Sequence, residues 1–138
     1  MRLVTISTDN VGIGSVAPTA ALDVTGNINV SGSIAIEDWN TPTFQNSWVN
    51  YGGTWEPAGY YKDKFGVVHL KGLIKNGTLN QAAFTLPVGY RPNYGRHLAT
   101  LSGNGNTACI LYIYSDGTVV PSAVCSSTWT SLEVSFRP

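Results

Sequence analysis

The sequence has little charge of either sign. Lys, Arg, Asp and Glu make up only 12% of its 138 residues, and the eight basic residues balance the eight acidic ones. A typical globular domain contains about 25% of these residues. Because the sequence has no excess of basic residues to attract phosphates, it argues against nucleic acid as a partner. A surface so poor in charge is typical of a subunit in an assembled oligomer, or of an exterior rich in Ser, Thr and Asn.

Long hydrophobic runs are also lacking. The longest apolar run covers residues 108–114, whereas a membrane-spanning helix needs about 20 apolar residues. The N-terminal residues show neither the charged nor the apolar region of a signal peptide. We therefore expect neither membrane insertion nor signal-dependent secretion.

Residues that bind metals are few. The sequence contains two cysteines, Cys109 and Cys125, which are too few for a disulfide scaffold or a zinc site. They would pair if their strands were neighbours, but we expect two buried thiols. His69 and His97 lie far apart, and we expect His69 to face solvent on the polar face of a strand. We therefore expect no metal and no cofactor.

Patterns typical of catalytic sites are absent as well. The sequence contains no Gly-x-Ser-x-Gly element, which would place a nucleophilic serine on a sharp turn. Most acidic residues fall in expected turns, where Asp caps and bends the backbone. Nothing in their spacing favours the pair of carboxylates that hydrolyses glycosidic bonds. We therefore expect no enzymatic activity.

Residues 41–138 have the composition and pattern of a β domain. The whole sequence contains 15 Gly, 7 Pro, 4 Trp, 7 Tyr and 4 Phe, a balance that favours strands and turns over helices. About eight short strand-like segments alternate with turn signals, as in a sandwich or jelly-roll domain. We therefore predict an all-β chain whose residues 41–138 form an antiparallel β-sandwich head. The segments that we expect to be strands are residues 47–51, 58–62, 68–75, 83–86, 97–101, 107–114, 118–124 and 132–136.

Two of these segments carry the clearest patterns. Residues 68–75 alternate strictly between apolar and polar side chains, which predicts a half-buried strand. Residues 107–114 are apolar on both faces. We expect one face of this strand to lie in the core and the other, which carries Ile110, Tyr112 and Tyr114, to contact another subunit or a second layer. Asp116-Gly117 then predicts a tight hairpin turn.

Residues 1–40 differ from the head and are predicted to form a short shaft. Residues 22–36 alternate with period two, and Gly26 and Gly32 fall in the same phase as the apolar residues. A ribbon with a single apolar face cannot bury that face alone. Three copies around an axis would bury it, and packing against the head is the alternative. The residues expected in the core of this trimeric shaft are Val11, Ile13, Leu22, Val24, Ile28, Val30 and Ile34.

The glycines near the N-terminus raise the question of a nucleotide site. Gly12-x-Gly14-x-x-Ala17 has the shape of a dinucleotide fingerprint. In such a site a helix must begin directly after the glycines to hold the pyrophosphate. Pro18 and the period-two pattern leave no room for a helix before Gly26. We therefore interpret these glycines as a sharp turn that places Val11 and Ile13 beside Leu22 and Val24.

Aromatic residues are more numerous than the core of a head of this size needs. Trp55 and Trp129 lie in expected loops, and Tyr94 lies in the long loop 87–95. An aromatic ring in a loop, next to polar side chains, suits the apolar face and polar rim of a sugar. The alternative is that such rings fold back as a lid on the core. The expected ligand-binding residues are Trp55, Tyr94, Trp129, Asn93 and Asp116.

Two motifs resemble those of bacteriophage tail fibres. Residues 11–26 match the pattern Val-Gly-Ile-Gly-x-x-x-Pro-x-x-x-Leu-x-Val-x-Gly that is common in these proteins. Residues 66–78 and 84–92, which end in Leu-Pro-x-Gly-Tyr-Arg-Pro, are similar to the tip domain of phage receptor-binding fibres. Residues 130–136 also fit that domain.

The resemblance implies a homotrimeric virion fibre with a β-sandwich head that binds a glycan or protein on the host surface. Its N-terminal segment would attach to other virion proteins. Because binding residues vary between such heads, the resemblance assigns no site residue. Two alternatives stay open: a structural virion protein without a receptor, such as a head fibre or capsid cement protein, and a fibre of a phage-like contractile injection system.

Overall fold

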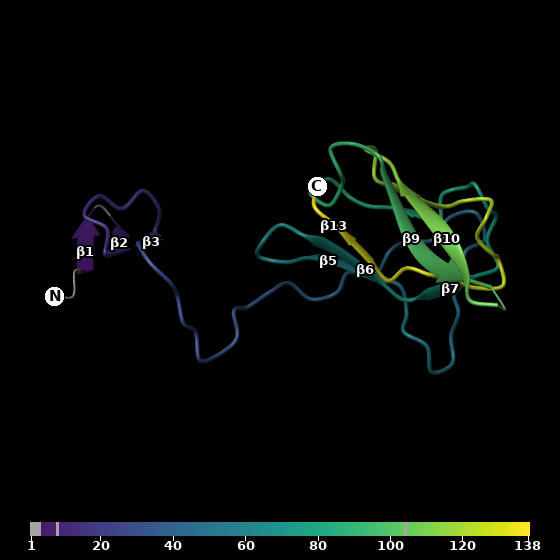
Figure 1. The fold of residues 1–138 in the computed structure, drawn as a ribbon, viewed down its shortest axis with the longest axis horizontal. Helices are drawn as coiled ribbons and strands as arrows, with labels where there is room; N and C mark the ends of the chain where they lie inside the picture. Colours follow the sequence, from purple (N-terminus) through teal and green to yellow (C-terminus); the bar gives the residue numbers. More distant parts are fainter. Residues whose placement is uncertain (1–3, 8, 104) are drawn as a thin grey trace. The chain divides into compact units, whose positions relative to one another are not determined.

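The chain is all-β, as predicted. A computed structural model describes residues 4–7, 9–103 and 105–138, and these form strands, turns and loops without a helix (Figure 1). Two compact units result, Met1–Ala35 and Ile36–Pro138. No helix that could cross a membrane occurs among the described residues.

The smaller unit contains one three-stranded sheet. Strand β1 (Val4–Ser7) pairs antiparallel with β2 (Asn10–Ile13), and β2 pairs parallel with β3 (Leu22–Val24). The parallel register places Val11 opposite Leu22 and Ile13 opposite Val24. These four side chains therefore lie side by side as expected, although Ile13 and Leu22 remain exposed.

The glycine loop between β2 and β3 is organised around a carboxylate of the chain itself. Gly14 adopts φ +72°, a turn conformation that glycine favours. Oδ2 of Asp23 accepts hydrogen bonds from the backbone N–H of Thr19 at 3.2 Å and from Oγ of Ser15 at 3.3 Å. No helix follows the glycines. This geometry agrees with a structural turn and differs from a dinucleotide site.

The period-two ribbon is shorter than predicted. Only Leu22–Val24 form a strand, and residues 25–36 have no strand partner. Their apolar side chains are exposed, with Ile28 66%, Val30 46% and Ile34 59% accessible. A strand needs a neighbour for its backbone hydrogen bonds and a surface for its apolar face. The last such backbone bond is from Thr25 N to the carbonyl of Ile13 at 2.9 Å, and no strand forms beyond Val24 among the described residues of this segment, so the predicted strand over residues 22–36 is wrong there within a single chain.

The larger unit contains two antiparallel sheets. One comprises β5 (Gly59–Lys62), β6 (Val68–Lys71) and β13 (Val134–Phe136), in the order β13-β6-β5. The other sheet has seven strands in the order β4-β7-β12-β9-β10-β11-β8. Its strands are β4 (Val49–Asn50), β7 (Leu73–Lys75), β8 (Phe84–Thr85), β9 (Arg96–Ser102), β10 (Thr107–Ile113), β11 (Thr118–Pro121) and β12 (Thr130–Ser131).

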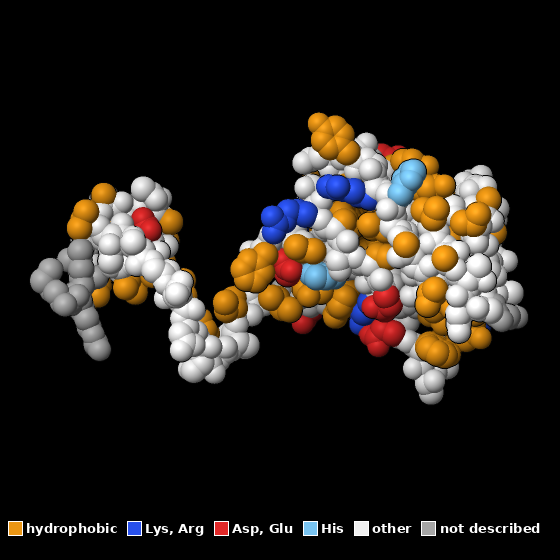
Figure 2. All heavy atoms as spheres, viewed as in Figure 1, with side chains coloured by type: hydrophobic (Ala, Val, Ile, Leu, Met, Phe, Trp, Pro, Cys, Tyr) orange, Lys and Arg blue, Asp and Glu red, His pale blue; other side chains and the backbone are white. Residues whose placement is uncertain are grey.

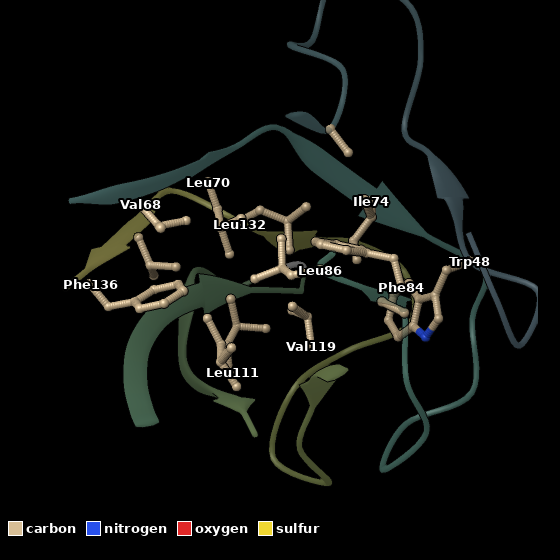
Figure 3. Packing of buried hydrophobic residues seen from close by; sticks show 14 residues of the cluster. Trp48, Val68, Leu70, Ile74, Phe84, Leu86, Leu111, Val119, Leu132 and Phe136 are labelled. Carbon is tan, nitrogen blue, oxygen red and sulfur yellow. The ribbon is translucent and has the colours of Figure 1, made fainter. Parts of the chain in front are cut away.

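One hydrophobic core joins the two sheets. Val68 and Phe136 of the three-stranded sheet point toward Leu111 and Val119 of the seven-stranded sheet (Figure 3). The alternation in residues 68–75 predicted one buried face, and Val68, Leu70 and Ile74 on that face are all buried. Burial of such side chains from water is the main stabilising term of the fold.

Residues 68–75 form two strands where the sequence predicts one. Gly72 interrupts the run with φ +104°, so that β6 joins one sheet and β7 joins the other. A Cβ atom at Gly72 would lie 2.6 Å from the backbone of Ala58. The glycine therefore permits a close approach of two segments at the point where the chain changes sheets.

Strand β10 separates a buried face from an exposed one. Cys109, Leu111 and Ile113 are buried, as predicted for the core-facing side. Ile110 and Tyr114 on the other face are 36% and 45% exposed. The contact of this face with another subunit or layer stays a prediction.

Cys109 and Cys125 form a disulfide, so the expectation of two thiols is wrong. The strand expected over residues 118–124 ends at Pro121, and the chain then turns back toward β10. Two backbone hydrogen bonds fix this turn, from Ser122 N to the carbonyl of Ile110 at 3.0 Å and from Cys125 N to the carbonyl of Ser122 at 3.0 Å. The early turn brings the two Cα atoms within 4.7 Å.

Residues 37–40, which the sequence analysis assigned to the shaft, are hydrogen-bonded to the larger unit. The Glu37 carboxylate accepts hydrogen bonds from the backbone N–H of Lys62 at 2.7 Å and from the hydroxyl of Tyr90 at 2.8 Å. The bond to Glu37 raises the pKa of Tyr90 above its usual value. Asn40 forms a β-bridge with Tyr60.

Candidate functional site

The larger unit has a hollow of about 640 Å³ beside strands β7, β9 and β12. Aromatic and apolar side chains provide much of its lining, and polar side chains complete it. Such a mixture and such a volume are typical of ligand sites. The lining residues are Tyr51, Trp55, Leu73, Thr100, Leu101, Asn106, Trp129, Ser131 and Glu133.

One aromatic wall comes from the loop after β4. Tyr51 and Trp55 meet edge to face, with ring centroids 6.3 Å apart and planes at 87°. Gly52 and Gly53 have φ angles of +86° and +65°, which allow the tight turn between the two rings. The backbone N–H of Tyr51 donates to the carbonyl of Leu73 at 2.8 Å. The wall is therefore anchored to β7, while Trp55 keeps 60% of its surface exposed.

Trp129 provides aromatic surface from a second loop, which precedes β12. Its carbonyl accepts a hydrogen bond from the backbone N–H of Gly103 at 3.0 Å. Within the same loop, Oγ1 of Thr130 donates to the carbonyl of Ser126 at 2.8 Å, and the hydroxyls of Ser126 and Thr128 are 2.7 Å apart. These bonds hold the backbone of the loop that carries Trp129 in place.

The polar side chains of the hollow are also held by the fold. Oγ1 of Thr100 donates to the carbonyl of Ser131 at 3.1 Å. Oε1 of Glu133 accepts a hydrogen bond from the backbone N–H of Gly72 at 2.9 Å. Fixed polar groups at the edge of an apolar hollow give orientation and selectivity to a bound molecule.

The structure brings two of the predicted ligand residues together, Trp55 and Trp129, which both line the hollow. Tyr94 and Asn93 lie in the exposed loop 87–95 and do not line it, and Tyr94 is 80% exposed. Asp116 stabilises the predicted hairpin turn, where its carboxylate accepts hydrogen bonds from the N–H and hydroxyl of Thr118. Those bonds hold the pKa of Asp116 below its usual value. The ligand roles of all five residues stay predictions.

Sequence reasoning missed the other lining residues. Tyr51 falls at the end of the expected strand 47–51, so its position in the sequence does not mark it as an aromatic residue in a loop. Ser131 ends β12 and Glu133 lies between β12 and β13, whereas the sequence predicts one strand over residues 132–136. Their only early signal is their proximity in sequence to Trp129.

His69 lies in a hydrogen-bonded chain instead of facing solvent alone. Its Nε2 is 2.8 Å from Oδ2 of Asp63, and its Nδ1 is 2.8 Å from Oγ of Ser135. The ring also stacks on Tyr61 with centroids 4.8 Å apart. The hydrogen bond to His69 is the main cause that lowers the pKa of Asp63.

These residue types also occur in hydrolases, but their positions here favour a structural role. The other carboxylate oxygen of Asp63 accepts the backbone N–H groups of Phe65 and Val67, each at 2.9 Å, and so stabilises the turn before β6. None of Asp63, His69 and Ser135 lines the hollow. The described residues contain no group of three or more His, Cys, Asp or Glu side chains suited to a metal ion.

Comparison with known proteins gives one structural likeness. No family model and no curated protein matches the chain. The crystal structure of the receptor binding protein of Listeria phage PSA is similar, with a TM-score of 0.56 and 20% sequence identity. The match covers 72% of this chain and 63% of the phage chain, so this chain spans less than two thirds of that protein. The chain therefore shares its fold with a phage receptor binding protein.

Proposed function

We propose that this chain is a non-enzymatic component of a phage virion, a fibre-like protein whose larger unit binds a saccharide on the host surface. The observation that carries the proposal is the hollow that Tyr51, Trp55 and Trp129 line together. The shared fold with a phage receptor binding protein supports the same role.

A saccharide suits the hollow for three physical reasons. The C–H face of a sugar ring packs on aromatic surface, and three aromatic side chains line the hollow. Hydroxyls of the sugar need fixed polar partners, which Thr100 and Ser131 can provide. The volume of about 640 Å³ lies within the range of roughly 300–1,000 Å³ found for small-molecule sites.

Few charged side chains are available for the long-range attraction of a partner, because Lys, Arg, Asp and Glu make up only 12% of the residues. Charged side chains are sparse on the face of the larger unit shown in Figure 2, where most atoms are white or orange. With few charges, long-range steering contributes little to association. Selectivity then depends on contacts inside the hollow.

Location and competition together test this proposal. Immunogold labelling is expected to place the protein on the tail fibre, and the purified chain is expected to bind host cells and reduce phage adsorption. Labelling of the capsid, together with no binding to host cells and no effect on infection, would instead favour a head fibre or capsid cement protein.

We also propose that the chain assembles as a homotrimer through the smaller unit and the exposed residues 25–36. The apolar side chains of Ile28, Val30 and Ile34 would then be buried between copies. Light scattering at micromolar concentration is expected to give three times the 14.7 kDa mass of one chain. A mass of one chain would rule out the trimer.

The substitution Ile28→Asp is expected to shift the assembly toward smaller species, because it would bury an unpaired charge in the proposed interface. Asn29→Asp adds the same charge one position along, on the opposite phase of the alternation, and is the matched control. Sedimentation velocity measures both. Equal assembly of the two variants would show that residues 25–36 pack elsewhere.

A further inference from the structure

We propose that the hollow selects a saccharide that carries a positively charged amino group, and that Glu133 is the residue that recognises this charge. The inference rests on the proposed function, because it names the class of saccharide. It comes from the charge of the lining residues and from the positions of the neighbouring cations.

Glu133 is the one charged residue among the nine described residues that line the hollow. Its Oε1 atom accepts the backbone N–H of Gly72 at 2.9 Å, and its own backbone N–H donates to Oγ of Ser131 at 3.2 Å. The bond from Gly72 holds one oxygen of this exposed carboxylate at the edge of the hollow and leaves the second oxygen available for a ligand. An anionic ligand would meet this carboxylate with no lining cation to offset the repulsion.

The nearby cations are engaged with other groups. Lys71 pairs with the Glu56 carboxylate, and its Nζ lies 4.6 Å from the ring centroid of Trp39. Nζ of Lys75 lies 4.7 Å from the ring centroid of Tyr51. Glu133 takes part in neither of the ion pairs between described side chains. Its charge is therefore left for a ligand.

The aromatic rings add to the preference for a cation. The face of an aromatic ring carries negative potential and attracts ammonium groups. Trp55 and Trp129 present such rings around the same hollow as the carboxylate, whereas the ring of Tyr51 already lies under Nζ of Lys75. A sugar with a free amine satisfies both features, because its ring packs on the aromatic side chains while its ammonium pairs with Glu133.

Three trisaccharides with closely similar backbones distinguish the effect of the amino group's charge on affinity from the effect of the sugar rings. They are the trimers of glucosamine, of N-acetylglucosamine and of glucose, all β-1,4-linked. Binding to the full chain is measured by calorimetry at about pH 6, where free amines with pKa values near those of α-amino groups are protonated. The glucosamine trimer is expected to bind about tenfold more tightly than the other two. Added salt is expected to reduce this difference.

Two variants test whether the preference for the glucosamine trimer comes from the carboxylate of Glu133. Glu133→Gln keeps an oxygen that accepts the Gly72 N–H, and it is expected to abolish the preference for the glucosamine trimer. Glu56→Gln makes the same change of charge outside the lining residues and is expected to retain it. Thermal unfolding of both variants verifies that the fold is intact.

The outcomes separate this inference from the proposed function. Equal binding of the three trimers by the native chain, or an unchanged preference in Glu133→Gln, would overturn the role of Glu133 and leave saccharide binding in place. Failure of all three trimers to bind would also overturn the inference, while the adsorption assay would still decide whether the chain is a receptor-binding protein.

Discussion

Replacement of Trp129 by alanine is expected to lower the affinity of the chain for host cells by about thirtyfold or more. Large aromatic side chains at the centre of a binding site commonly contribute about 2 kcal/mol or more, which corresponds to this factor. The loop that carries Trp129 is held by the hydrogen bonds of Gly103 and Thr130, so removal of the ring leaves the backbone in place. The binding of labelled protein to host cells measures the effect.

Tyr94→Ala is the matched control for this prediction. Tyr94 is also a large aromatic residue in a loop and is 80% exposed, but it does not line the hollow. Its replacement is expected to change affinity less than about twofold, as for most residues outside a binding centre. The reverse result, with binding lost in Tyr94→Ala and kept in Trp129→Ala, would move the receptor site to the loop 87–95.

Gly77→Ala is expected to destabilise the larger unit by about 3 kcal/mol. A Cβ atom at residue 77 would lie 1.9 Å from a ring atom of Trp48. Trp48 is only 1% exposed, and its Nε1 donates to the carbonyl of Thr78 at 3.3 Å, so the ring cannot move without loss of packing and of a hydrogen bond. Insertion of atoms into a packed core commonly costs about 1–3 kcal/mol, and rigid surroundings place this site at the upper end. Chemical denaturation measures the free energy of unfolding.

Gly95→Ala supplies the comparison for Gly77→Ala. A Cβ atom at residue 95 would find its nearest neighbour at 3.9 Å, in ordinary contact with the ring of Tyr114. A surface change of this kind usually alters stability by less than about 0.5 kcal/mol. If both variants unfold at the same denaturant concentration, the account of Trp48 and Gly77 is wrong.

Local patterns predict the parts of the fold that depend on neighbouring residues. The alternation over residues 68–75 identifies Val68, Leu70 and Ile74 as core residues, because side chains of a strand alternate between its faces. Asp116-Gly117 likewise identifies the hairpin between β10 and β11, because those residue types stabilise a tight turn. Both features follow from fewer than ten consecutive residues.

The sequence patterns do not predict features that depend on contacts between distant segments of the chain. Gly72 divides a run that alternates without a break, and the reason is the close approach of Ala58. The disulfide between Cys109 and Cys125 depends on a turn at Ser122, which lies inside the segment 118–124 that the sequence predicts as one strand. In the ribbon, residues 25–36 carry a strand pattern, but the part of the chain that the structure describes offers them no partner strand.

In the candidate site, too, local sequence indicates some features, while contacts between distant segments determine the others. Trp55 and Trp129 stand out in sequence as aromatic residues in loops, but only the fold brings them to one hollow. Tyr94 has the same local signal and lies outside it. Composition can therefore identify candidate aromatic residues. The strand order β7-β12-β9 determines which of them line the same hollow.

The central claim, that the aromatic hollow binds the receptor, is tested most directly by NMR of the tryptophan indoles during titration with cell-wall fragments from host bacteria. The chain has four tryptophans, of which Trp55 and Trp129 line the hollow, whereas Trp48 is buried and Trp39 packs on Tyr61. The account predicts that the indole N–H signals of Trp55 and Trp129 shift together with one affinity, while those of Trp39 and Trp48 do not. Saturable binding that leaves the signals of Trp55 and Trp129 unchanged would contradict it.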